Sequence, residues 1–175
     1  MSVFWCFLLG EDVMKRLSLA FLVVLVSMLA LVSASPTALA APATKEPFSA
    51  TMTYTGMTPP KRFWTDEEGV QHARGFGETF SISGGIVGTV ALTVNWNFVY
   101  SDYSPSGDAQ AKGIITSGED VYLMSADVTV VMGTPSGTFV IRGTGSCKRI
   151  HITGMLSSTA EGLLVLEGTK LTTKP

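Results

Sequence analysis

Few residues in this chain are of the types that carry metal binding, and their spacing does not favour it. The sequence holds two histidines, His72 and His151, and neither is accompanied by the paired cysteines of a metal-binding motif. His72 lies in a charged segment with Asp66 and Arg74, where a small polar site and a solvated loop are the two alternatives. His151 alternates with two isoleucines and is predicted to point away from the core. We therefore predict no metal ion and no cofactor.

Nucleophilic and acid–base catalysis find equally little support. No Gly-x-Ser-x-Gly motif occurs, and a serine triad would have to use one of the two histidines. The carboxylates Glu67 and Glu68, like Glu119 and Asp120, are adjacent in sequence, and adjacent residues of a strand point to opposite faces. No catalytic residue is predicted, and the sequence favours a non-enzymatic protein over an enzyme.

Three side chains are candidates for a polar site: His72, Arg142 and Cys147. Cys147 has no partner for an internal disulfide once the N-terminal segment is removed, and it is either a small buried apolar residue or a reactive or intermolecular thiol. Arg142 and Asp127 fall inside predicted strands, and alternation places both of them outward. Either one inside the fold would mark a polar site.

An aromatic row gives the best candidate for a ligand surface. Trp96, Phe98 and Tyr100 recur at every second residue of one strand and share a face, and Tyr122 and Met124 begin the next long apolar row. Tyr and Trp combine apolar area with one polar group, which suits a cavity. The alternative is that these five residues are ordinary core.

The N-terminal segment has the layout of a secretory signal peptide. Lys15 and Arg16 precede an apolar run at 17–32, and Ala38-Leu39-Ala40 supplies small residues for cleavage. The alternative is a retained membrane anchor, for which 16 residues are short, since a span needs about 20. Met14 is an alternative start that would make residues 1–13 an over-extended reading frame. We expect cleavage after Ala40 and a secreted or periplasmic protein.

The remaining chain has the size of one domain. Residues 41–46 are predicted to form a linker and residues 47–175 the folded domain. The net charge is −2 with no basic stripe, so nucleic acid is not expected as a partner, nor is a membrane after cleavage. Nothing in the sequence defines an oligomeric state.

Hydrophobic residues alternate with polar ones through most of this domain, which predicts strands and little helix. The first row is Phe48, Ala50, Met52 and Tyr54. Residues 61–75 are predicted to form a loop or short hairpin that turns at Glu68-Gly69, and the long row from 86 to 100 is expected to bend near Gly88. Turns are predicted at 101–108 and 133–137. About eight or nine strands with short connections predict an all-β fold, a single antiparallel up-and-down β-barrel of about eight strands.

The C-terminal half resembles the allene-oxide-cyclase-like, calycin-type barrels. The resemblance covers residues 75–171 and rests on four short glycine-containing phrases, namely Ser136-Gly137-Thr138-Phe139, Gly143-Thr144-Gly145, Ile152-Thr153-Gly154 and Leu166-Glu167-Gly168-Thr169. It implies an eight-stranded barrel with a central cavity. The plant cyclases of that superfamily isomerise an oxylipin epoxide, but their catalytic residues find no match in this chain, so the resemblance implies fold and not activity.

Three functions are therefore to be compared. The first is an exported barrel that binds a small apolar or amphipathic ligand in its interior. The second is an isomerase or cyclase that uses one or two polar groups in an apolar cavity. The third is a structural or interaction protein whose barrel is filled by its own side chains. A charged residue facing a cavity would favour the second, and a solidly packed interior the third.

Overall fold

The structure is a computed structural model that describes residues 43–174. The predicted signal peptide at 1–40 and the alternative start at Met14 lie outside the described residues. The elements are β1 (Thr44–Thr58), β2 (Arg62–Thr65), β3 (Gln71–Gly84), β4 (Gly88–Ser101), β5 (Ser104–Ser117), β6 (Asp120–Val131), β7 (Thr134–Gly143), the 3₁₀ turn η1 (Gly145–Cys147), β8 (Ile150–Ser158) and β9 (Leu164–Thr172). No helix within 43–174 is long and apolar enough to cross a membrane.

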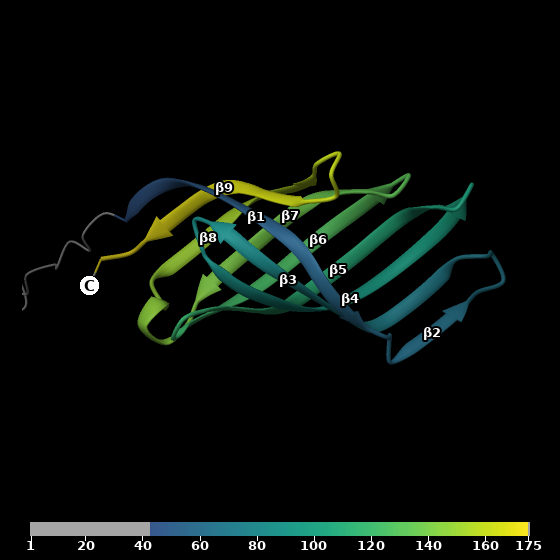
Figure 1. Cartoon of the computed structure of the whole chain (residues 1–175), viewed down its shortest axis with the longest axis horizontal. Coiled ribbons are helices and arrows are strands. Elements are labelled where there is room, and N and C mark those ends of the chain that lie inside the picture. The colour runs from purple at the N-terminus through teal and green to yellow at the C-terminus, as the bar shows by residue number, and fades with distance from the viewer. Residues whose placement is uncertain (1–42, 175) are drawn as a thin grey trace, which may run out of the picture. The chain divides into compact units, whose positions relative to one another are not determined.

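Eight of these strands close into an antiparallel barrel (Figure 1). From β3 to β9 each strand pairs with the next one along the chain, and β1 closes the cylinder by pairing with both β9 and β3. The short strand β2 pairs with β3 alone and extends the wall beyond the point where β1 ends. The predicted all-β, up-and-down barrel is therefore confirmed.

The strands are longer and the turns shorter than the sequence pattern indicated. The predicted turn at 101–108 is wrong, because only Asp102 and Tyr103 lie between β4 and β5, with φ of 48° and 66°. The turn predicted at 133–137 likewise contracts to Met132 and Gly133, with φ of 49° and 79°. Positive φ at both central residues matches the twist of the flanking strands in a two-residue hairpin. The Ser, Pro and Gly residues that suggested loops are thus paired in β5 and β7.

The N-terminal edge of the barrel also begins earlier than predicted. Strand β1 starts at Thr44, inside the segment 41–46 for which a linker was expected. Residues 44–46 pair with residues 170–172 of β9, so the backbone hydrogen bonds of the barrel wall continue there. The segment at 61–75 is a hairpin, as one of the two predicted alternatives stated, and Gly69 in its turn has φ of 80°.

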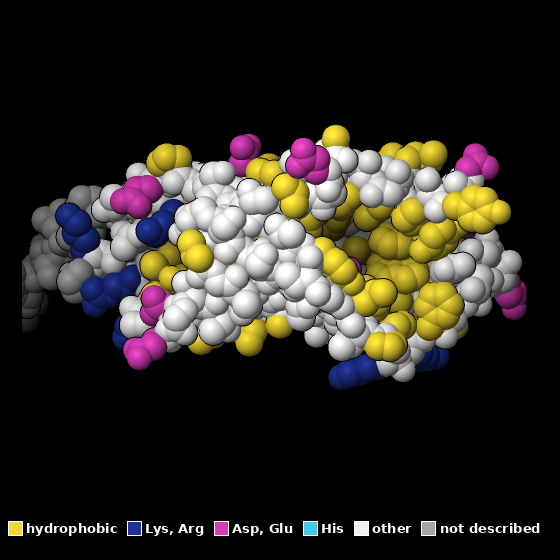
Figure 2. Space-filling model, in the orientation of Figure 1, with side chains coloured by type: hydrophobic (Ala, Val, Ile, Leu, Met, Phe, Trp, Pro, Cys, Tyr) yellow, Lys and Arg dark blue, Asp and Glu magenta, His cyan; other side chains and the backbone are white. Residues whose placement is uncertain are grey.

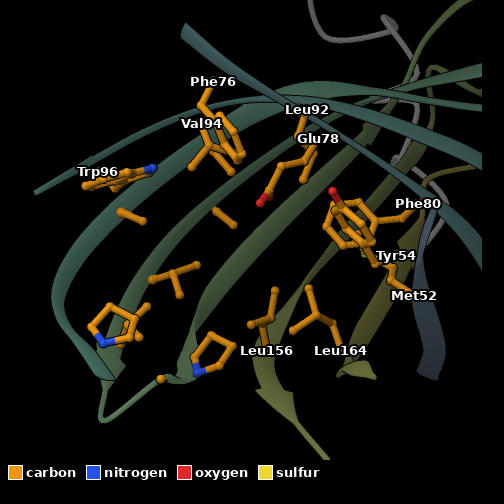
Figure 3. A pocket seen from close by; sticks show the side chains of 18 of the residues that line it. Met52, Tyr54, Phe76, Glu78, Phe80, Leu92, Val94, Trp96, Leu156 and Leu164 are labelled. Carbon is orange, nitrogen blue, oxygen red and sulfur yellow. The ribbon is translucent and has the colours of Figure 1, made fainter. Parts of the chain in front are cut away.

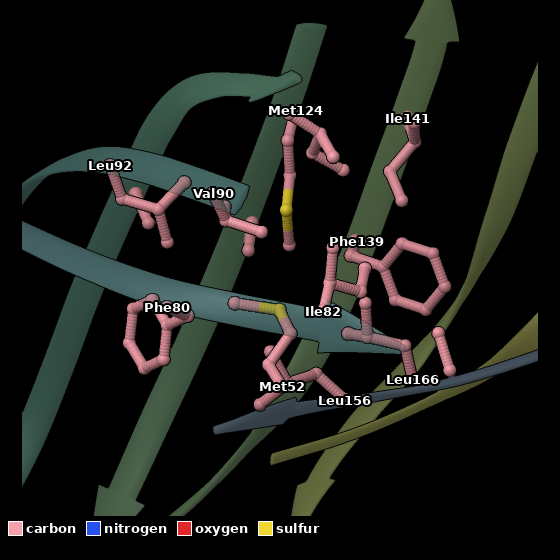
Figure 4. Packing of buried hydrophobic residues seen from close by; sticks show 14 of the residues in the cluster. Met52, Phe80, Ile82, Val90, Leu92, Met124, Phe139, Ile141, Leu156 and Leu166 are labelled. Carbon is pink, nitrogen blue, oxygen red and sulfur yellow. The ribbon is translucent and has the colours of Figure 1, made fainter. Parts of the chain in front are cut away.

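The core occupies one half of the barrel. Its fully buried side chains come from inward positions of seven strands and meet as one cluster (Figure 4), which includes Met52, Ile82, Val90, Ile115, Phe139, Ile141, Ile152 and Leu166. These residues lie toward the end where η1 connects β7 to β8, and we call this the closed half. Alternation along each strand brings them together, since every second side chain of a barrel strand faces inward.

Two glycines make room for the largest side chains of the core. Phe139, Gly154, Gly168 and Phe48 stand opposite one another across β7, β8, β9 and β1. The rings of Phe48 and Phe139 meet with their centroids 6.1 Å apart. The strands approach so closely at the two glycines that a Cβ on Gly154 would lie 2.0 Å from the carbonyl oxygen of Glu167. Glycine is therefore required here for a close backbone approach.

Candidate functional site

The other half of the barrel encloses a cavity of about 550 Å³. This volume lies in the usual range for small-molecule sites, about 300–1,000 Å³. The wall is formed by inward side chains of β1 and β3–β9 and is almost entirely apolar (Figure 3). Its floor is formed by side chains that also belong to the core, namely Met52, Phe80, Leu92, Met124 and Leu156.

The cavity extends toward the hairpins at the end of the barrel opposite η1. Tyr100, Pro105, Gly133, Pro135 and Gly162 line it, and each lies within or a few residues from a turn that joins β4 to β5, β6 to β7 or β8 to β9. Figure 2 shows this end as a hollow surrounded by hydrophobic side chains. Several apolar side chains at these hairpins are exposed to solvent, namely Val99, Tyr103, Val131 and Met132. An apolar molecule would meet apolar surface at this mouth.

The predicted aromatic row lines the mouth of the cavity. Trp96 and Phe98 stack with ring centroids 4.6 Å apart and an interplanar angle of 12°. Phe63 of β2 packs edge-on against Trp96 at 6.0 Å, and Ala73 between them in the sheet is fully buried. Tyr100 continues the row but is 46% exposed. The structure thus places the row on the cavity wall, with an extension from Phe63 that sequence reasoning missed.

The two residues predicted on the next apolar row, Tyr122 and Met124, have different surroundings in the structure. Met124 lines the cavity floor, whereas Tyr122 is buried at the closed half and does not line the cavity. The Tyr122 hydroxyl donates a hydrogen bond to the Sγ of Cys147 at 3.4 Å. Burial and this bond raise the pKa of Tyr122 well above its ordinary value. Cys147 is half-buried in η1, at the opposite end of the barrel from the mouth.

Arg142 does not contribute to the cavity. Its side chain is exposed on the outer face of β7, as alternation predicted, and Asp127 is exposed on the outer face of β6. In register, Arg142 stands between Leu123 of β6 and His151 of β8. Neither charged residue enters the barrel.

Glu78 is the charged side chain that faces the cavity, and sequence reasoning missed it. It lies on β3 between Phe76 and Phe80, and its carboxyl group projects inward (Figure 3). Burial raises the pKa of Glu78 above its ordinary value, since desolvation penalises the charged form. The alternation of Phe80 and Ile82, continued two residues toward the N-terminus, would have placed Glu78 inside.

His72 lies at the mouth end, on the outer face of the hairpin formed by β2 and β3. Its Nε2 is 2.8 Å from a carboxylate oxygen of Asp66, and its Nδ1 is 2.7 Å from the side-chain oxygen of Asn97. The imidazole stacks on Trp64 at 4.7 Å, and the guanidinium groups of Arg62 and Arg74 lie 4.6 and 5.2 Å from the centre of the Trp64 ring. These contacts join β2, β3 and β4.

Both ring nitrogens of His72 face hydrogen-bond acceptors, which favours the doubly protonated imidazolium. Arg74 donates to the same Asn97 oxygen at 2.7 Å, and because a guanidinium only donates, this Asn97 atom must accept. A carboxylate such as Asp66 also only accepts. Both contacts are satisfied together when His72 donates from both nitrogens, and the hydrogen bonds with Asp66 and Asn97 raise the pKa of His72 above its ordinary value. These contacts favour a structural role for His72, since both nitrogens are already engaged.

We expect the hairpin to loosen as the pH rises. The folded-state pKa of His72 is raised, so its contribution to stability is fully present below about pH 6.5 and is lost as the pH rises through the folded-state pKa. Thermal unfolding of wild type and His72→Gln between about pH 6 and pH 9 measures this. The gap between their Tm values should shrink with rising pH.

The matched control is His151→Gln, the same substitution at the other histidine on the outer face of β8. It lacks the Asp66 contact and should show no comparable convergence with wild type. A gap for His72→Gln that stays constant across this pH range would contradict the doubly protonated assignment.

No other arrangement in the described residues points to a known chemistry. Within 43–174, no group of three or more His, Cys, Asp or Glu side chains is placed to hold a metal ion. The chain matches no protein-family model, and no curated protein was found to resemble it. The closed eight-stranded antiparallel barrel is compatible with a calycin-type fold.

Proposed function

We propose that this protein binds a small apolar or amphipathic molecule inside its barrel. The observation that carries the proposal is the apolar cavity of about 550 Å³ above a tightly packed core. An interior filled by side chains was the condition for a purely structural barrel, and a cavity of this size argues against it.

The physical basis of binding is the apolar wall. Removing apolar surface from water contributes about 25 cal/mol per Å², and the cavity is part of the fold itself. The stacked rings of Trp96 and Phe98 offer a flat apolar face near the mouth. A pre-formed site spares the ligand the cost of ordering the protein.

The proposal includes export. The predicted signal peptide at 1–40 would deliver the barrel to the periplasm or the medium, where it would hold or carry a molecule that is poorly soluble in water. Mass spectrometry of the protein recovered from the expressing culture tests this directly. An intact mass beginning near Ala41 supports export, and a chain retaining residues 14–40 in the membrane fraction would contradict it.

Binding is tested with the neutral fluorescent probe N-phenyl-1-naphthylamine and the variant Ala126→Phe. Ala126 is buried and lines the cavity, so a phenylalanine there would occupy the space of the ligand. We expect the variant to bind the probe about tenfold more weakly or worse, which corresponds to the loss of part of the apolar contact.

The matched control is Ala91→Phe, which places the same side chain on the outer face of β4. It should bind the probe as wild type does, and circular dichroism should show the same strand content in all three proteins. Native mass spectrometry of gently purified protein adds a second readout, a co-purifying small molecule. No probe binding by wild type would overturn the proposal.

Catalysis by an isomerase or cyclase of the allene-oxide-cyclase-like kind is the second candidate function, and Glu78 is the observation that favours it. A carboxyl group with a raised pKa inside an apolar cavity is suited to proton transfer. Isomerisation leaves the mass unchanged, so chromatographic separation of a bound ligand before and after incubation is the test. Conversion by wild type and not by Glu78→Gln would support catalysis, and an unchanged ligand would support binding alone.

A further inference from the structure

We propose that the cavity selects an apolar ligand that carries a protonated amine, held by the carboxylate of Glu78. The inference rests on the proposed function and specifies the chemical class of its ligand. It follows from the position of Glu78 in the cavity, from the hydrophobic side chains around it, and from the absence of Lys, Arg and His among the described residues that line the cavity.

Glu78 is surrounded by hydrophobic side chains. On its own strand, Phe76 and Phe80 flank it at inward positions, and across the sheet it stands opposite Leu92 of β4. Figure 3 shows its carboxyl oxygens projecting from this apolar wall into the cavity. Along β3, Glu78 lies between Phe76 and the floor residue Phe80.

Within residues 43–174, no cationic partner for this carboxylate lines the cavity. The lining contains no Lys, Arg or His, and the two ion pairs of the described chain join other residues, His72 with Asp66 and Lys170 with Glu46. A carboxylate in an apolar site without a counter-charge is unfavourable, because it has lost the stabilisation that water gives to its charge. A cation at hydrogen-bond distance would replace that stabilisation. Burial raises the pKa of Glu78, which is the direction expected of a carboxyl group in an apolar site without a cationic side chain beside it.

Head groups of other charge are less suitable. A carboxylate or phosphate head would meet Glu78 as a like charge in a site of low dielectric constant. An uncharged hydroxyl would form a hydrogen bond without the charge attraction that a protonated amine provides. A protonated primary amine supplies three donors and a full positive charge, and its alkyl chain would cover the apolar wall toward Trp96.

The test compares three molecules with one tail: decylamine, 1-decanol and decanoate, each displacing N-phenyl-1-naphthylamine at about pH 7. For wild type we expect decylamine to displace the probe at a concentration about tenfold lower than decanol does, which is the order of magnitude of a hydrogen bond to a charged group. Decanoate should be the weakest of the three. The ranking should persist at about 0.5 M NaCl, because a buried ion pair is screened far less than a surface one.

Two variants at Glu78 assign the preference to its charge. Glu78→Gln keeps the size and hydrogen bonding of the side chain, and Glu78→Met keeps its length and makes it apolar. Both should bring decylamine and decanol to within about threefold of each other, since the charge attraction is gone. Glu119→Gln, on the exposed turn between β5 and β6, changes the net charge equally and should keep the wild-type ranking.

Each outcome distinguishes this inference from the function on which it rests. If wild type does not bind the probe, the proposed function fails. If it binds the probe and the three head groups compete equally, only the amine selectivity fails. An amine preference that survives in folded Glu78→Gln or Glu78→Met also overturns it. If neither variant folds, as judged by circular dichroism, the wild-type ranking and its persistence in salt decide the question.

Discussion

Truncation of Phe139 to alanine is expected to lower the free energy of unfolding by about 3–5 kcal/mol. Phe139 is 1% exposed and lies at the centre of the closed half, with its ring against that of Phe48. Its removal loses the transfer free energy of the ring and leaves a cavity that the barrel backbone is too constrained to close. Urea unfolding followed by far-ultraviolet circular dichroism measures the change.

Phe63→Ala is the matched control for this experiment. Phe63 is 54% exposed on the hairpin strand β2, and its ring contacts only the edge of the cavity wall at Trp96. We expect a loss of about 1 kcal/mol or less, as for most substitutions at exposed sites. A loss below about 1 kcal/mol for Phe139→Ala would show that the closed half is not the stabilising core of the barrel.

Substitution of Gly154 by alanine is expected to destabilise the barrel by about 3 kcal/mol, or to prevent folding. The added Cβ would lie 2.0 Å from the Glu167 carbonyl oxygen and 2.6 Å from the Cα of Gly168. Both are backbone atoms of β9, so no side-chain rotation relieves the contact and the two strands must separate. The yield of soluble protein and its Tm are the measurements.

Gly56→Ala provides the comparison within the same sheet. At Gly56 of β1 the added Cβ would approach only the hydroxyl of Thr79, at 3.2 Å, and this side-chain atom has to shift by only a few tenths of an ångström. We expect little change in Tm for this variant. Equal Tm values for Gly154→Ala and Gly56→Ala would contradict the view that close strand approach, rather than sheet propensity, requires the glycine.

These two experiments concern the closed half, whereas the ligand experiments concern the open half. The closed half contains most of the largest fully buried side chains, and the open half contains the cavity, Glu78 and the aromatic mouth. Ala126 is itself buried and stands opposite Phe139 in the sheet, so the Tm of Ala126→Phe is measured beside its probe binding, and a loss of binding is scored only for folded protein. Natural binding sites in barrels commonly occupy one mouth in this way.

Much of the fold could be predicted from alternation alone. The row that contains Val90, Leu92, Val94 and Trp96 faces inward as predicted, and the outward placement of Arg142 follows from the same period of two. The turn boundaries could not be predicted in this way. Asp102-Tyr103 and Met132-Gly133 adopt positive φ although three of these four residues are not glycine. Cross-strand pairing decided those turns, whereas local propensity indicated longer loops around Pro105 and Pro135.

The sequence by itself determined that this chain forms an antiparallel barrel and, away from the register shifts in β1 and β3, which side chains face its interior, because a regular strand repeats every two residues. Only the tertiary structure decided which part of that interior is solid and which is hollow. Tyr122 and Met124 share one row, yet one packs at the closed end and the other lines the cavity. The register between strands places Phe139 opposite Gly154 in the closed half and Ala111 opposite Ala126 on the cavity wall, and that register exists only in the closed sheet.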